Sequence, residues 1–281
     1  MDHGIHVAIV TPIKNGQIDK ESFLKHITYL EKDPKCKGIV LFGSTGEGSS
    51  MTLDQKVVIM NALATKKTKL QVTIGIGGIC TQDIIDCAII SKKYFPNAIM
   101  MLSPPPYVKA SQNSITRHFS EIIGNDRLAT TKFMLYNIPS RTGVTISVET
   151  IVLLKYAFGD RIVAIKDATG NVVELCKLKS HDITIDVFCG DDNLYPAMKA
   201  LGAVGLVSVY GNYSCKELAV TDRTYYNAML QKRIAWVGLE NPRMIKHLLG
   251  YKKIIDNNDL LPPLAYGDDD VTNDVKELFT L

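Results

Sequence analysis

The sequence has no apolar run long enough to cross a membrane. Its first residues, MDHGIHVAIVTP, lack a basic region and a cleavage site, so we expect a cytoplasmic protein. An excess of one charge is also missing, since 32 Lys and Arg against 29 Asp and Glu give a formal net charge of +3 over 281 residues. Because the basic residues are dispersed, we expect neither nucleic acid nor a membrane as a partner.

Metal and disulfide signatures are absent as well. None of the six cysteines belongs to a CxxC pair, so we expect reduced and mostly buried thiols. The six histidines are scattered; only His3 and His6 are near one another, and we expect no metal site from them.

Short apolar runs recur along the chain, and segments with helical spacing separate them. The eight runs are 6–10, 38–42, 70–76, 98–102, 132–136, 162–166, 184–189 and 204–209. Helical spacing is clearest at 23–30, 53–63, 84–94, 115–122 and 148–156. Eight strand–helix repeats with right-handed crossovers can close a parallel (β/α)8 barrel, the TIM barrel, which we predict. A doubly wound open sheet is the alternative, but its glycine fingerprint is missing after the first run.

The C-terminal part has a different pattern. After Asn212 the strand-like runs stop, and we predict helices at 216–233, 242–255 and 272–279. The expected organisation is therefore a barrel core at 1–212, followed at 213–281 by the last barrel helix and a small helical extension. We interpret the acidic triplet at 268–270 as a helix cap.

Lys166 ends the apolar run at 162–166 and is followed directly by Asp167. A continuous apolar run is typical of a strand covered on both faces, where burial disfavours the charged form of an amine. A neutral amine is a nucleophile that forms a carbinolamine and then a Schiff base with a ketone or keto acid. The alternative is an ordinary lysine paired with Asp167, which strand geometry opposes because neighbouring side chains point to opposite faces.

The glycine-rich segment GSTGEG at 43–48 follows the second predicted strand and leads to a helix that starts near Leu53. Glycines let backbone N–H groups approach a ligand, and a helix N-terminus favours an anion, so we predict a cradle for a carboxylate or phosphate. It is not a P-loop, because it lacks Gly-Lys-Ser/Thr. A glycine-rich turn with a capping Ser or Thr is the alternative.

The fifth predicted strand ends at Tyr136 and continues as NIPSRTG at 137–143. Tyr136 should face the same strand ends as Lys166, where barrels of this kind build their active sites. A phenol there can shuttle protons, and the planar fork of Arg141 suits a substrate carboxylate. A packed tyrosine and a surface arginine are the alternatives.

Two further loops follow predicted strands. Three prolines at 104–106 make a stiff, extended loop that projects Tyr107. Asp191 and Asp192 suggest a metal, but no third ligand accompanies them, so we interpret them as helix-capping and loop residues.

Several of these motifs share an order and a spacing. Taken together, they resemble the dihydrodipicolinate synthase/N-acetylneuraminate lyase family of class I aldolases over residues 7–212. The motifs that carry the resemblance are GSTGEG (43–48), the loop ending in Tyr107, YNIPSRTG (136–143), IVAIKDATGN (162–171), CGDDN (189–193) and GLVSV (205–209). The segment at 136–143 resembles the synthase version, because the sialic acid lyases lack the arginine at the place of Arg141.

The resemblance implies a role for each catalytic candidate. Lys166 matches the lysine that binds pyruvate as a Schiff base, and Tyr136 matches the tyrosine that relays protons at the imine. Ser44 and Tyr107 match the other members of the proton relay, with Tyr107 reaching into a neighbouring subunit's site.

The resemblance also implies substrate contacts. Ser44 and Thr45 border the pyruvate carboxylate, and Arg141 holds the carboxylate of aspartate semialdehyde. Gly190 and Val207 match positions whose backbone lines the pocket. The expected reaction condenses pyruvate with L-aspartate 4-semialdehyde to 4-hydroxy-tetrahydrodipicolinate, on the diaminopimelate route to lysine. The family uses no metal or organic cofactor and forms homotetramers built from tight dimers, so we expect a homotetramer or homodimer.

Departures from the pattern leave alternatives open. Ser44 stands where synthases usually carry threonine and the lyases serine, so an N-acetylneuraminate lyase or a 2-keto-3-deoxy acid aldolase is the nearest alternative. A non-catalytic keto-acid-binding barrel is an alternative of another class. Leu53, Lys56, Cys80 and Pro106 stand where lysine-inhibited members carry histidines, an asparagine and a tyrosine, so we expect no inhibition by lysine.

Overall fold

The computed structural model describes residues 1–219, 228–265 and 271–279. The strand order is β1-β10-β9-β8-β7-β6-β5-β4, which is the order of a closed barrel. The prediction of a (β/α)8 barrel is confirmed, and the open-sheet alternative is wrong. The chain divides into two compact units, a first of Met1–His3 with Val72–Val207 and a second of Gly4–Gln71 with Ser208–Leu281.

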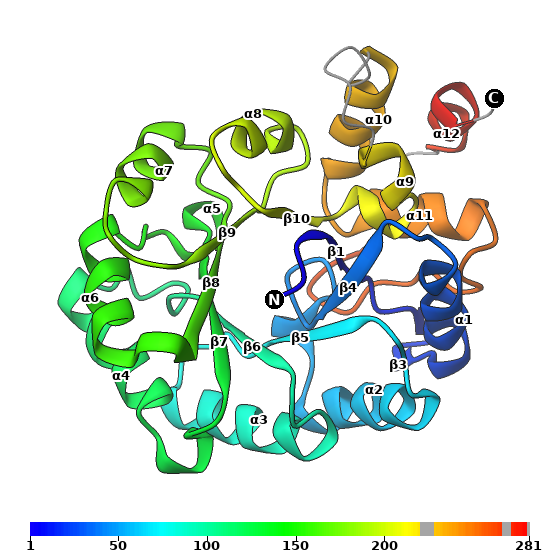
Figure 1. Ribbon diagram of the computed structural model, residues 1–281. Coiled ribbons are helices and arrows are strands. Elements are labelled where there is room, and N and C mark those ends of the chain that lie inside the picture. Colours follow the sequence, from blue (N-terminus) through cyan, green and yellow to red (C-terminus); the bar gives the residue numbers. More distant parts are fainter. Residues whose placement is uncertain (220–227, 266–270, 280–281) are drawn as a thin grey trace. The chain divides into compact units, whose positions relative to one another are not determined.

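The first unit holds consecutive parallel strands with helices on their outer side (Figure 1). The strands are β5 (Gln71–Gly75), β6 (Ile99–Leu102), β7 (Lys132–Asn137), β8 (Ile162–Asp167), β9 (Asp186–Cys189) and β10 (Gly205–Ser208). The helices are α3 (Thr81–Tyr94), α4 (Gln112–Ile123), α5 (Pro139–Thr142), α6 (Val148–Phe158), α7 (Val172–Lys179) and α8 (Tyr195–Ala200).

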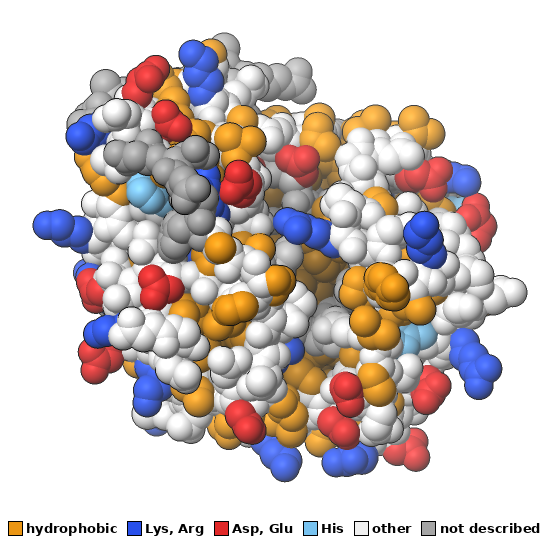
Figure 2. Space-filling model, turned by 180° about the vertical axis from the view of Figure 1, so that it is seen from behind, with side chains coloured by type: hydrophobic (Ala, Val, Ile, Leu, Met, Phe, Trp, Pro, Cys, Tyr) orange, Lys and Arg blue, Asp and Glu red, His pale blue; other side chains and the backbone are white. Residues whose placement is uncertain are grey.

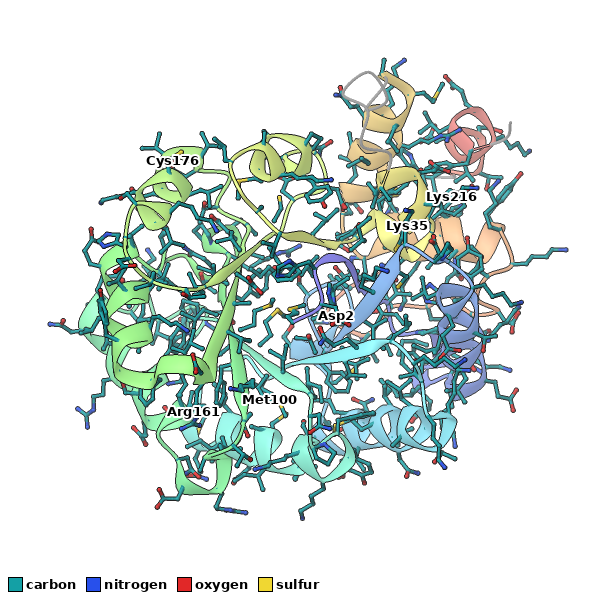
Figure 3. The ribbon with its side chains drawn as sticks, viewed as in Figure 1. Asp2, Lys35, Met100, Arg161, Cys176 and Lys216 are labelled. Carbon is teal, nitrogen blue, oxygen red and sulfur yellow. The ribbon has the colours of Figure 1, made fainter. Side chains whose placement is uncertain are left out.

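Burial explains why these strands read as unbroken apolar runs. Every residue of β6 is buried, including Met100, which Figure 3 labels. The start of β8 is fixed by Arg161, also labelled there, whose guanidinium donates to the carbonyl of Leu128 at 2.7 Å and lies over the Phe133 ring. These contacts hold the strand that carries Lys166 in place.

The helices of the first unit begin where polar side chains accept their first free N–H groups. Ser111 accepts from the backbone of Ser114 at the start of α4, and Ser147 accepts from Thr150 at the start of α6. Such caps satisfy N–H groups that have no partner inside a helix, and each typically stabilises it by about 1 kcal/mol.

The second unit combines two parallel strands with helices from both ends of the chain. Its elements are β1 (Gly4–Ala8), β2 (Ile13–Lys14), β3 (Gln17–Ile18), α1 (Lys20–Glu31), β4 (Cys36–Leu41), α2 (Leu53–Lys66), α9 (Cys215–Leu218), α10 (Ala228–Gly238), α11 (Arg243–Tyr251) and α12 (Thr272–Phe279). β1 pairs with β4, and β2 with β3. Asn212 joins this unit together, because its amide accepts from the backbone of Val10 and donates to the carbonyl of Ala8.

The structure departs from the predicted elements in several places. The β2–β3 hairpin was not predicted, because two-residue strands are too short to show a period. The helix predicted at 216–233 is interrupted: α9 ends at Leu218 and α10 begins at Ala228, while 220–227 lie outside the described residues. The helix predicted to reach 255 ends at Tyr251, since Lys253 takes a left-handed φ of 57°. The triplet at 268–270 lies outside the described residues, and the boundary at residue 212 stays a prediction.

The surface charges and the cysteines agree with the sequence. On the face in Figure 2, basic and acidic side chains are interspersed. Within the described ranges, no helix is both long and apolar enough to cross a membrane. Four of the six free cysteines are buried, as predicted, while Cys80 and Cys176 are exposed.

Candidate active site

Lys166 and Tyr136 are brought together by the pairing of neighbouring strands. In the β7–β8 ladder Tyr136 stands directly opposite Lys166. Both are nearly buried, at 7% and 5% exposure, and Nζ of Lys166 lies 4.0 Å from the centroid of the Tyr136 ring. The predicted proximity of amine and phenol at one strand end is therefore confirmed.

Asp167 does not neutralise this amine. Its Oδ1 accepts hydrogen bonds from the backbone N–H of Thr169 at 2.9 Å and from the Thr169 hydroxyl at 2.7 Å. Among the described residues, no ion pair or hydrogen bond is recorded for the ammonium of Lys166. The alternative of an ordinary Lys166–Asp167 pair is wrong.

The end of β8 is packed tightly against the end of β9. The backbone N–H of Gly190 donates to the carbonyl of Asp167 at 2.7 Å. A Cβ atom at Gly190 would lie 2.7 Å from Cβ of Ala168, so a larger residue does not fit there. Val207 is buried on β10. Gly190 can offer a ligand only its backbone, and the lining role of both positions stays a prediction.

The loop after β7 is held by the side chain of Asn137. Its Nδ2 donates to the carbonyl of Ile146, and its Oδ1 accepts from the N–H of the same residue, both at 2.9 Å. The short helix α5 lies within this loop and ends at Gly143, whose φ of 72° is left-handed. The backbone N–H of Arg141 donates to the carbonyl of Ile138 at 3.0 Å, while its exposed guanidinium makes no hydrogen bond or ion pair with described residues. Its guanidinium is therefore available to a ligand.

Tyr107 occupies a strained turn. The N–H of Val108 donates to the carbonyl of Pro106 at 2.9 Å, so Tyr107 is the central residue of a γ-turn, with a φ of 73°. Such a conformation is unfavourable for a bulky residue and marks functional sites more often than ordinary loops. The ring is 91% exposed. The loop projects Tyr107 away from its own unit, as the proline run predicts.

In the second unit, the loop at 43–48 is folded back on itself. The N–H groups of Gly46 and Gly48 both donate to the carbonyl of Gly43. A Cβ at Gly48 would lie 2.0 Å from the carbonyl oxygen of Phe42, which explains the glycine. No described residue accepts from the backbone N–H of Ser44 or Thr45, so two adjacent donors stay open for an anion.

The helix end that was expected to favour this anion has part of its N–H groups satisfied by its own cap. α2 begins at Leu53, as predicted, but Thr52 and Gln55 form a reciprocal capping box there. The short 3-10 turn Gly48–Ser50 also separates the loop from the helix. The loop's own backbone therefore offers the nearest open donors, and the helix contribution to the cradle stays a prediction.

The carboxylates and the thiol at the end of β9 have structural surroundings. No group of three or more His, Cys, Asp or Glu side chains lies close enough there to hold a metal ion. Asp191 accepts from the N–H of Asn193, which confirms the loop interpretation, although the cap of α8 is Leu194. Burial raises the pKa of Cys189 to about 12, so that thiol is not a nucleophile near neutral pH.

A model of the Dihydrodipicolinate synthetase family matches residues 1–280. The chain belongs to this family. A 4-hydroxy-tetrahydrodipicolinate synthase of Rickettsia bellii is 31% identical over 292 aligned positions, covering 99% of this chain and 96% of the relative. That of Geobacter metallireducens is 34% identical over 239 positions, covering 83% and 78%. A solved dihydrodipicolinate synthase from Aquifex aeolicus has a TM-score of 0.88 and 26% identity, covering 98% of this chain and 96% of that chain.

Membership of the dihydrodipicolinate synthetase family confirms the resemblance seen in the motifs. The roles of individual residues stay predictions. Sequence reasoning missed two contacts of the glycine-rich loop: Glu47, within the loop, pairs with Lys246, and Asn241 donates to Thr45. The one signal available was the charge of Glu47 between two glycines, because a carboxylate inside such a tight turn needs a partner.

Proposed function

We propose that the chain is a 4-hydroxy-tetrahydrodipicolinate synthase, a lyase of the class I aldolase type that acts on pyruvate and L-aspartate 4-semialdehyde. The observation that carries the proposal is the buried amine of Lys166, 4.0 Å from the ring centroid of Tyr136 and without an ion-pair partner among the described residues. Family membership supports the reaction, and these two side chains supply its reactive groups.

Covalent catalysis follows from the chemistry of the amine. Nζ of Lys166 adds to the keto carbon of pyruvate, and loss of water gives an imine with a positively charged nitrogen. That nitrogen draws electrons from the methyl group, which loses a proton to form an enamine. The enamine carbon attacks the aldehyde carbon, and the aldehyde oxygen takes up a proton. The amine of the second substrate then attacks the imine carbon, which closes the ring and releases Lys166.

Proton transfer is the proposed work of Tyr136. Its position over the amine suits transfers during imine formation and enamine attack. Ser44 and Tyr107 complete the relay in this proposal. Because the Tyr107 ring is 91% exposed, we place it in the site of a neighbouring copy, within a homodimer or homotetramer.

Two carboxylates have to be recognised. The open N–H groups of Ser44 and Thr45 suit the carboxylate of pyruvate. The guanidinium of Arg141 has no protein partner among the described residues, so it suits the carboxylate of aspartate semialdehyde. Gly190 and Val207 contribute backbone lining. The cytoplasmic location expected from the sequence completes the proposal and is checked by cell fractionation.

Rates with several aldehydes test the proposal. We expect turnover of pyruvate with aspartate semialdehyde, and little cleavage of N-acetylneuraminate or of 2-keto-3-deoxy sugar acids. Arg141→Ala should raise KM for aspartate semialdehyde far more than KM for pyruvate, while Arg117→Ala, at an exposed position on α4, should change neither. Efficient cleavage of N-acetylneuraminate with no use of aspartate semialdehyde would favour the rival aldolase. Pyruvate binding without any turnover would favour the non-catalytic barrel.

A further inference from the structure

Asn241 reaches the glycine-rich loop from the C-terminal part of the second unit. It precedes Pro242, the N-cap of α11, and its Nδ2 donates to Oγ1 of Thr45 at 3.0 Å across 196 positions of sequence. Thr45 is only 2% exposed, and Oδ1 of Asn241 is buried without a partner among the described residues. Burying the amide oxygen of Asn241 without a partner costs free energy, so the hydrogen bond that the NH2 group makes to Thr45 needs an explanation.

The contact fixes the polarity of the Thr45 hydroxyl. A hydroxyl has one proton to donate and two lone pairs that accept. Because Asn241 donates to Oγ1, the proton of Thr45 is left for another acceptor, and the described residues provide none. A carboxylate is the acceptor that such a donor binds most strongly, since hydrogen bonds to ionised groups are about twice as strong as neutral ones.

The loop around Thr45 is fastened at the next two residues as well. The hydroxyl of Thr11 donates to the carbonyl of Gly46 at 2.8 Å. Both side chains of the Glu47–Lys246 ion pair are 0% exposed, with Nζ 2.5 Å from Oε1, and Oε2 of Glu47 accepts from the N–H of Leu261. The loop cannot turn away, so the direction of the Thr45 hydroxyl is set before a ligand arrives.

We propose that Asn241 is a positioning residue for the pyruvate carboxylate: its amide holds the Thr45 hydroxyl as a hydrogen-bond donor. This inference rests on the proposed function. It gives the region around α11 a part in substrate binding, beyond that of a packed appendage.

Substitutions that preserve shape but reverse hydrogen-bond polarity test the proposal. Asn241→Asp keeps the size of the side chain, but an ionised carboxylate can only accept, so it would accept the hydrogen bond of the Thr45 hydroxyl and add a negative charge. We expect it to raise the pyruvate concentration for half-maximal borohydride labelling of Lys166 by roughly 10- to 100-fold. Asn241→Ala, which only deletes the amide, should raise it less. Asn257→Asp makes the same change in an amide that contacts Asp19 instead, and should leave pyruvate binding unchanged.

The order of the two variants separates positioning from a structural role. If Asn241 only packs, the isosteric Asp is milder than Ala, and that order would overturn the proposal. We also expect KM for aspartate semialdehyde and kcat at saturating pyruvate to change little.

A double-mutant cycle covers the case in which Asn241→Asp fails to fold. Asn241→Ala should weaken pyruvate binding in the wild-type background and have no further effect when Thr45 is already Val. Equal losses in both backgrounds would show that Asn241 does not act through Thr45. Wild-type protein that pyruvate and borohydride do not label would instead refute the proposed function itself, so the two failures are distinguishable.

Discussion

Lys166 in the first unit and Lys246 in the second are both removed from water, at 5% and 0% exposure, yet their ammonium groups have different surroundings. Lys246 Nζ lies 2.5 Å from Oε1 of Glu47 and 2.5 Å from the carbonyl of Asp259. Lys166 has no such partner among the described residues and lies over the ring of Tyr136. A buried lysine that is fully paired holds a structure together, whereas one without an anion is free to react.

The pKa of Lys246 shows how the competing effects balance there. Burial lowers the pKa of this amine, and the carboxylate of Glu47 opposes that shift. Nζ of Lys246 is already engaged by Glu47 and by the carbonyl of Asp259, so it is not placed to attack a ketone. The two surroundings therefore assign chemistry to Lys166 and loop anchoring to Lys246.

The largest expected effect concerns the phenol over Lys166. Tyr136→Phe removes the hydroxyl and keeps the ring, so kcat should fall by roughly two to four decades, the usual contribution of a general acid or base. The melting temperature should change little. Tyr195→Phe, at another buried tyrosine of the first unit, serves as the control and should leave kcat near the wild-type value. A drop below tenfold for Tyr136→Phe would remove the phenol from the mechanism.

Breaking the structural pair should reduce stability instead. Lys246→Met leaves Glu47 buried without its partner, so the free energy of unfolding should fall by about 3–5 kcal/mol in urea titrations. Adding Glu47→Gln should restore most of it, because the amide is neutral and its oxygen still accepts from the N–H of Leu261. Lys177→Met, which breaks an exposed ion pair with Glu149, should hardly change the urea concentration at the unfolding midpoint. If the double variant is no more stable than Lys246→Met, the pair is not what holds the loop.

A third buried base makes the stability of the second unit depend on pH. Burial lowers the pKa of His26 from 6.5 to about 4, and its hydrogen bond to the carbonyl of Asn212 opposes the shift. As pH falls, the unfolded chain is protonated first, so stability present above the unfolded pKa near 6.5 is lost as pH falls toward the folded pKa of about 4. The loss should reach roughly 3 kcal/mol.

Urea titrations of the wild type and His26→Gln between pH 7.5 and 4.5 measure how much of the acid-induced loss of stability comes from His26. The variant should lose less stability over that range than the wild type, whereas His181→Gln, at an exposed histidine, should follow the wild type. Parallel curves for the wild type and His26→Gln would show that His26 does not set the acid response.

The smallest expected effect is that of L-lysine. Feedback inhibition needs groups that bind the ammonium and carboxylate of lysine better in one state of the enzyme than in another. Leu53 offers no hydrogen bond, Lys56 adds a like charge, and Pro106 lacks a phenol, so millimolar lysine should leave the rate unchanged. Isothermal titration alongside the rate assay checks both binding and effect. Saturable binding with partial inhibition would contradict this prediction.

Much of the site could be predicted because the strands of a parallel barrel are buried on both faces and stand out in the sequence as continuous apolar runs. The apolar run ending at Lys166 specifies both a covered strand and a buried amine, and parallel pairing then brings Tyr136 opposite it. Asn241 could not be predicted, because its contact with Thr45 spans 196 positions and leaves no local pattern. The γ-turn at Tyr107 could not be predicted either, because a run of prolines indicates a stiff loop but does not show that the next residue has a positive φ.

The most direct measurement of the central claim is to treat the protein with pyruvate and borohydride and to map the labelled peptide by mass spectrometry. Reduction traps the imine, so we predict one irreversible label, at Lys166, and none in Lys166→Ala. Lys155→Ala, whose amine donates to the carbonyls of Gly159 and Ile162, should be labelled at Lys166 like the wild type. A label at Lys246 or any other lysine, or no label under conditions of turnover, would contradict the assignment of chemistry to the unpaired amine.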